Sequence, residues 1–149
     1  QSVDDRLIPS NIYDSLISFI PRLKNIEYAK LYPEQQTGDG SIEHPFQMPF
    51  YEYADVVHEF EKEVYKFEKD HPEFQLNTYN NIFLMNGLRW DEEVMTKADV
   101  SNANGQVVMA LILGAIRAER FCDGTLKDFL ELGCIEKWLL RLQEIASKI

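Results

Sequence analysis

The stretch QVVMALILGAIRAERFCDG, residues 106–124, changes from wholly apolar to highly charged along its length. Residues 107–116 include no charged or strongly polar side chain. This run is too short to cross a bilayer, which takes roughly 20 apolar residues, and its alanines and leucines favour helix over strand. A helix that is apolar on every side has to be surrounded by the rest of the chain. The stretch therefore predicts an all-α fold, a compact bundle built around a buried central helix.

Both ends of this central helix carry boundary signals. Ser101, Asn102 or Asn104 can cap its start, since a short side-chain oxygen accepts a hydrogen bond from a free amide of the first turn. Gly124 is expected to end it, because glycine enters the left-handed conformation at no steric cost.

Four charged side chains follow the apolar run: Arg117, Glu119, Arg120 and Asp123. Ions at the end of a buried helix must be paired or reach water, because an unpaired buried charge is very costly. In a structural interpretation, the arginines bind carboxylates and carbonyls of neighbouring helices and complement the helix dipole. In a functional interpretation, the four line a polar pocket whose two guanidiniums bind an anionic ligand. We keep them as candidate ligand-binding residues.

Length and charge restrict the classes of function. The chain has 149 residues, enough for one domain that buries about 68–70% of its unfolded surface and needs no disulfide or metal. Its net charge of −10 argues against direct binding to nucleic acid or to an anionic membrane, since both need basic surface. A basic protein partner is compatible with this charge. Cys122 and Cys134 form no CxxC motif, which favours a reducing cytoplasm.

The remaining sequence predicts a single helical domain over residues 1–149, with about six or seven helices. Residues 1–9 are expected to be a tail. A first helix begins at Ser10, and Pro21 should end or kink it because proline removes a helix hydrogen bond. Apolar spacing predicts further helices at 51–70, 77–87, 91–99, 125–132 and 135–149.

The segment 28–50 is the one long irregular stretch, with three prolines and two glycines. We expect a loop there; its GDG motif is a turn signal, and a short two-stranded hairpin is the weaker alternative. Its aromatic residues Tyr32, Phe46 and Phe50 predict that the loop packs against the domain. Long loops in compact domains are often functional.

Acidic residues concentrate in the helix that follows this loop. Residues 51–75 hold eight acids and three lysines, so they carry half of the net charge. Asp55, Glu59 and Glu63 recur at i, i+4 and should repel one another. The row is either a solvated outer face or an interaction surface, and we keep these three as candidate interface residues.

Metal sites and catalytic motifs are not expected. Asp55-x-x-His58 and Glu68-x-x-His71 resemble elements of di-iron bundles, where facing helices supply them. Here both fall on one helix, about 20 Å apart at roughly 1.5 Å per residue, so they cannot share an ion. The two cysteines lack paired zinc-ligand spacing. We find no nucleophile elbow, phosphate loop or dinucleotide motif, and expect no cofactor.

The motif RAERFCDG, residues 117–124, resembles the signature of a family of small bacterial proteins known as a domain of unknown function. The similarity extends to the tyrosine-rich residues 51–53, and to Trp90, Met95, Ala98, Asp99, Leu139, Arg141 and Leu142. This resemblance implies a stand-alone cytoplasmic domain and brings no established activity.

Two hypotheses for the function follow. The first is a non-enzymatic protein-interaction or regulatory module that acts through its acidic surface on a basic partner, or as a homodimer that buries a leftover apolar face. The alternative is a small-anion-binding protein or an enzyme with its site at the end of the central helix. A deep cleft into which Arg117, Glu119, Arg120 and Asp123 converge would favour the alternative.

Overall fold

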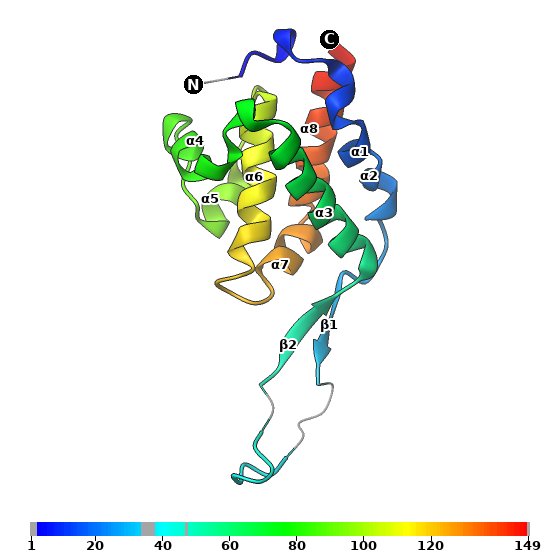
Figure 1. The fold of residues 1–149 in the computed structure, drawn as a ribbon, viewed down its shortest axis with the longest axis vertical. Helices are drawn as coiled ribbons and strands as arrows, with labels where there is room; N and C mark the ends of the chain where they lie inside the picture. Colours follow the sequence, from blue (N-terminus) through cyan, green and yellow to red (C-terminus); the bar gives the residue numbers. More distant parts are fainter. Residues whose placement is uncertain (1–2, 34–37, 47, 149) are drawn as a thin grey trace.

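The computed structural model describes residues 3–33, 38–46 and 48–148. Its centre is α6 (Gly105–Ala118), in which every residue from Gly105 to Ile116 is buried. Packed around α6 are α3 (Asp55–Asp70), α4 (Tyr79–Met85), α7 (Thr125–Glu131) and α8 (Cys134–Lys148) (Figure 1). The mostly helical fold and its buried central helix are thus confirmed.

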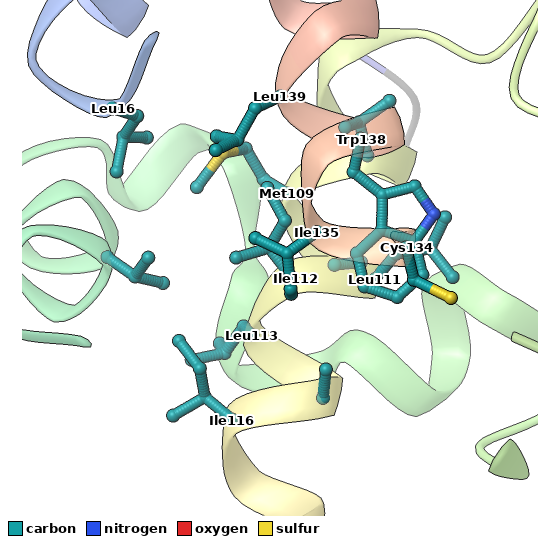
Figure 2. Close-up of a cluster of buried hydrophobic side chains, with 14 of the residues drawn as sticks. Leu16, Met109, Leu111, Ile112, Leu113, Ile116, Cys134, Ile135, Trp138 and Leu139 are labelled. Atoms are coloured by element: carbon teal, nitrogen blue, oxygen red, sulfur yellow. The ribbon is translucent and has the colours of Figure 1, made fainter. Parts of the chain in front are cut away.

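The core is densest where α8 faces α6. Figure 2 shows Ile135 and Leu139 of α8 beside Met109 and Ile112 of α6, with Trp138 of α8 to the right of them. All five side chains are fully or almost fully buried. Burying a large apolar side chain contributes about 1.5–3 kcal/mol, so this contact is a main source of stability.

The first predicted helix is interrupted. A 3-10 turn (Ser10–Tyr13) leads into α1 (Asp14–Ile17), and α2 (Phe19–Arg22) follows after Ser18. Pro21 lies inside α2, and the break precedes it. Proline has no N–H to donate to the carbonyl of Ile17, and its ring crowds that carbonyl, so the interruption falls there.

Both boundaries of α6 are now defined. Asn104 is the N-cap, and its Oδ1 accepts a 2.9 Å hydrogen bond from the Val107 N–H. The helix ends at Ala118, earlier than Gly124, which instead precedes α7 with a φ of 93°. Residues 119–124 therefore form a turn between α6 and α7, and the charged part of the signature lies mostly in that turn.

Residues 3–9, expected as a tail, are docked on the start of α6. The Val3 N–H donates to Gln106 Oε1 at 3.3 Å, and the Asn104 side-chain amide donates to the Val3 carbonyl at 3.0 Å. Asp5 Oδ1 accepts from the Gly105 N–H at 2.9 Å. The last of these bonds satisfies the Gly105 N–H, an amide of the first turn of α6 that has no partner within the helix.

The segment expected as a loop forms the weaker alternative, a hairpin. β1 (Ala29–Tyr32) pairs antiparallel with β2 (Phe50–Tyr53), with Tyr32 opposite Phe50. The hairpin projects from the helical body (Figure 1). The expectation that aromatic residues hold this segment against the body is wrong, because the Tyr32 and Phe50 rings contact each other, with centroids 6.3 Å apart and planes tilted by 30°, and Phe46 packs on Gly40.

A short helix, α5 (Glu92–Lys97), completes the body. Asp91 caps it, with Oδ1 accepting a 3.0 Å hydrogen bond from the Val94 N–H. In the part of the chain that the structure describes, every helix is too short or too polar to cross a membrane.

Candidate functional site

The four charged residues at the end of α6 point to two different neighbours. Glu119 and Asp123 accept hydrogen bonds from Tyr53 and Tyr51 of β2, and Glu119 also accepts from a backbone amide at the start of α7. Arg117 and Arg120 contact Glu68 and Tyr65 of α3. The two pairs therefore have different surroundings.

Glu119 links the hairpin to the turn after α6. Its carboxylate accepts hydrogen bonds from the Tyr53 hydroxyl at 2.7 Å, the Gly124 N–H at 3.1 Å and the Leu126 N–H at 3.0 Å. The Tyr53 hydroxyl in turn accepts from the Lys127 N–H at 2.9 Å. Burial, together with the bond to Glu119, raises the pKa of Tyr53, so the neutral phenol is the donor. Glu119 therefore fixes the root of the hairpin.

Asp123 fixes the same root two residues earlier in β2. Its Oδ2 accepts a 2.8 Å hydrogen bond from the Tyr51 N–H. The Tyr51 ring lies so close to Gly124 that a Cβ at that position would be 2.8 Å from the ring. The Lys127 ammonium also lies over this ring, 5.3 Å from its centroid. The glycine is thus required both by its φ of 93° and by the approach of the tyrosine.

The two arginines hold the end of α6 against α3 and α4. Arg117 Nη2 lies 3.4 Å from both carboxylate oxygens of Glu68, and its guanidinium lies 5.6 Å from the Tyr79 ring centroid. Arg120 is exposed and donates to the Tyr65 hydroxyl at 3.2 Å. These contacts agree with the structural interpretation, and ligand binding by the four charged residues stays a prediction.

The acid row on α3 is partly neutralised. Glu59 Oε1 accepts a 2.9 Å hydrogen bond from Arg22 Nη2 of α2, and both side chains are about half exposed. Asp55 is exposed and Glu63 is half-buried. The row begins two residues after β2, so it continues the surface of the hairpin into the helical body. Its role as an interface also stays a prediction.

The projecting hairpin exposes a set of apolar side chains, of which the sequence analysis singled out only the three aromatic ones and expected them to pack against the domain. We call its described residues, 28–33, 38–46 and 48–53, the arm. Ile42 is 101% exposed and Met48 is 81% exposed. Exposed to a lesser degree are Leu31, Tyr32, Phe46 and Phe50. Large apolar residues within a segment rich in proline and glycine were the available signal.

The tip of the arm is a defined turn. The His44 carbonyl accepts hydrogen bonds from the N–H groups of Asp39 at 2.9 Å and Gly40 at 3.1 Å. The Asp39 carboxylate accepts from the Ser41 N–H at 2.9 Å, and the Ser41 hydroxyl accepts from the His44 N–H at 3.0 Å. The bond to Ser41 lowers the pKa of the Asp39 carboxyl. Ile42 lies within this turn, and its side chain is fully exposed.

Metal ligands do not gather within the described residues. No group of three or more histidine, cysteine, aspartate or glutamate side chains there could hold an ion. His58 Nδ1 lies 3.3 Å from Glu61, and His71 Nδ1 lies 3.2 Å from Glu73, so each contacts a nearby acid on its own stretch of chain.

Comparison with known proteins gives one match. A family model described as "Family of unknown function (DUF6508)" matches residues 8–148. No curated protein and no solved structure matches the chain. The match covers nearly the whole helical body and the arm.

Proposed function

The chain belongs to the DUF6508 family, and we propose that it is a non-enzymatic protein-interaction module whose arm inserts into an apolar groove of a basic partner protein. The exposed apolar side chains on the projecting hairpin carry this proposal. Several large apolar side chains exposed on one element, rather than scattered singly, commonly mark a protein interaction site.

The arm offers a large gain on binding. Ile42 and Met48 are in water in the isolated chain, and full burial of such side chains contributes about 1.5–3 kcal/mol each. The pair of Tyr32 and Phe50 adds aromatic surface, a residue class that dominates interface energetics. An apolar groove in the partner would cover these groups.

The root of the arm is held in place before any partner arrives. Tyr53 bonds Glu119, and the Tyr51 N–H bonds Asp123, so the second strand is tied to the turn after α6. A segment already ordered in its bound conformation loses less entropy on association. We therefore assign Glu119 and Asp123 the role of aiming the arm.

Charge sets the sign of the partner. Residues 28–53 contain four acids and one lysine, and the acid row on α3 begins two residues beyond β2. Acidic side chains beside an apolar contact speed association with a basic surface and disfavour acidic ones. The partner is thus expected to present basic side chains around its groove.

We place this role in the cytoplasm of a bacterium. Cys122 and Cys134 are both free thiols, which is compatible with a reducing compartment. The bacterial source rests on the resemblance of residues 117–124.

A comparative pull-down tests the proposal. The bait carries Ile42→Ser and Met48→Ser together, and the matched control carries Leu132→Ser, an exposed leucine on the helical body. The expected result is a basic protein retained by the wild type and by the control, lost with the arm variant, and confirmed by binding of the two purified proteins. Equal retention by the arm variant overturns the proposal.

Charge reversal then tests the acidic flank. Glu59→Lys with Glu63→Lys should weaken binding of the purified partner and reduce its salt dependence, because rim charges act over distances that salt screens. If the captured species is a second copy of this chain, sedimentation shows a dimer that the arm variant lacks, and the basic-partner proposal fails.

A further inference from the structure

A cavity of about 270 Å³ opens at the C-terminal end of α6, beside the turn that joins it to α7. It lies between the end of α6, the start of α5, and α7, and it is open to solvent on one side. Its lining residues are Trp90, Asp91, Glu92, Met95, Ala118, Phe121, Cys122, Thr125 and Phe129. Arg117, Glu119, Arg120 and Asp123 are absent from this described lining, so the cavity is distinct from the predicted anion site.

The cavity has an apolar interior. Met95 and Phe129 are fully buried and form its inner surface. Trp90 and Phe121 form an aromatic edge, with ring centroids 5.4 Å apart and planes at 84°. An apolar cavity of about 150 Å³ is enough to bind benzene, so this one accommodates an aromatic ring with a short substituent.

Trp90 is fixed in its place in this cavity. Its Nε1–H donates a 2.9 Å hydrogen bond to the Gly114 carbonyl of α6, and its ring packs edge-on against Tyr79 at 5.2 Å. The indole is therefore anchored by its polar atom while its ring lines the cavity. Phe121 is 77% exposed and closes the outer edge.

The charged groups at the cavity are acidic. Asp91 and Glu92 line it, and none of the described lining residues is basic. Glu92 hydrogen-bonds Asp128, and burial followed by that bond raises the pKa of the Glu92 carboxyl. A bound cation would therefore reduce the repulsion between the ionised carboxylates of Glu92 and Asp128.

We propose that this cavity is a binding site for a small organic ammonium ion with an apolar body. The aromatic edge of Trp90 and Phe121 attracts a cation through the negative faces of the rings, and Trp is the strongest of the aromatic residues in this respect. Asp91 and Glu92 supply the opposite charge, and Met95 and Phe129 receive the apolar body. This site is separate from the arm and independent of its proposed role.

Three probes that share one ring test the sign of the charge. Benzylammonium, benzyl alcohol and benzoate carry a cationic, a neutral and an anionic head. Binding is followed by the fluorescence of Trp90, against the constant signal of the buried Trp138. It is also followed by protection of Cys122 from alkylation, with the buried Cys134 as the internal reference.

Benzylammonium is expected to bind most tightly, to change the Trp90 emission and to slow alkylation of Cys122. Glu92→Gln, which keeps the shape of the side chain, should weaken benzylammonium about threefold or more and leave benzyl alcohol unchanged. The matched control is Glu93→Gln, an exposed glutamate of α5 that pairs with Lys97 outside the cavity, and it should change neither affinity.

Phe121→Ala is a second variant. Because Phe121 is largely exposed, its truncation should leave the fold intact. It should weaken benzylammonium by a similar factor. The proposal is overturned if the three probes bind equally or if none of them binds in the cavity. It is also overturned if Glu92→Gln leaves the affinity for benzylammonium unchanged. A preference for benzoate would overturn it in favour of the arginine-based anion site.

Discussion

The Tyr53 hydroxyl of β2 donates a 2.7 Å hydrogen bond to Glu119, which lies just after the central helix and 66 positions further along the chain. The same hydroxyl accepts a 2.9 Å hydrogen bond from the Lys127 N–H. One phenol thus joins the hairpin, the end of α6 and the start of α7. The arm's direction relative to the helical body depends on this junction.

Replacing Tyr53 by phenylalanine should destabilise the fold by about 1–3 kcal/mol, because Glu119 loses a donor and the Lys127 N–H loses its acceptor. Urea unfolding measures the change, and amide exchange of Tyr51 and Tyr53 should accelerate. A free energy of unfolding equal to that of the wild type would show that the junction does not hold the arm.

Tyr13→Phe removes the same atom from the core and serves as the control. Its hydroxyl is buried and has no hydrogen-bond partner among the described residues. The substitution should therefore leave the free energy of unfolding unchanged, or raise it by about 1 kcal/mol, since an unsatisfied buried polar group is removed. A loss as large as that of Tyr53→Phe would contradict this account.

Stability should fall at alkaline pH. Burial raises the pKa of both Tyr13 and Tyr53 above the ordinary value of 10.0, so the folded state keeps these phenols protonated. Below pH 10 the tyrosines are protonated in both the folded and the unfolded state, so the free energy of unfolding does not change. Above pH 10 the tyrosines of the unfolded chain ionise first, and the free energy of unfolding decreases. Tyr13→Phe should show a shallower decrease in urea titrations across this range.

Gly124→Ala should be more damaging than Gly87→Ala. Both glycines have positive φ, 93° and 73°, so each alanine costs about 1–2 kcal/mol for its backbone conformation. At Gly124 the new Cβ would also lie 2.8 Å from the Tyr51 ring, whereas nothing lies within 4 Å at Gly87. Thermal unfolding of the two variants measures the difference, and equal losses would show that the contact with Tyr51 is easily relieved.

Truncation to alanine should destabilise the fold much more at Arg117 than at Arg120. Arg117 and Glu68 are both mostly buried, so Arg117→Ala leaves a carboxylate without its partner and should cost about 2–4 kcal/mol. Arg120 is exposed, and Arg120→Ala should cost less than about 1 kcal/mol. Thermal unfolding of the two variants measures both losses.

Thermal unfolding of the same variants, each with and without a panel of small anions, also tests the predicted anion site. An anion that raises the unfolding midpoint of the wild type but not that of Arg120→Ala would support the predicted anion site.

The sequence alone determined the centre of this protein. The uncharged run at residues 107–116 indicated a helix buried on all sides, and the structure buries each of those residues. Local signals with a fixed range succeeded as well. Asn104 and Asp91 cap helices, and the side chain of each accepts a hydrogen bond from the amide three residues ahead. Such a contact depends on only four consecutive residues, so the sequence predicts it.

Pairings between distant segments were decided only by the tertiary structure. Whether Glu119 faced a ligand or the hairpin depended on where Tyr53 would lie, and residue spacing along one helix holds no information on that. The arm is a similar case. Its strands are short, and its aromatic residues could equally pack on the body or across the hairpin, so cross-strand pairing of Tyr32 with Phe50 decided the outcome.

The cavity beside Trp90 shows the same division. Its residues come from three separate stretches, 90–95, 118–125 and Phe129, and each stretch alone has an ordinary amphipathic or turn composition. Sequence periodicity predicts which face of a helix is apolar, because that depends on a repeat of 3.6 residues. It does not determine which faces meet imperfectly and leave a cavity, because that depends on the packing of all the helices around α6.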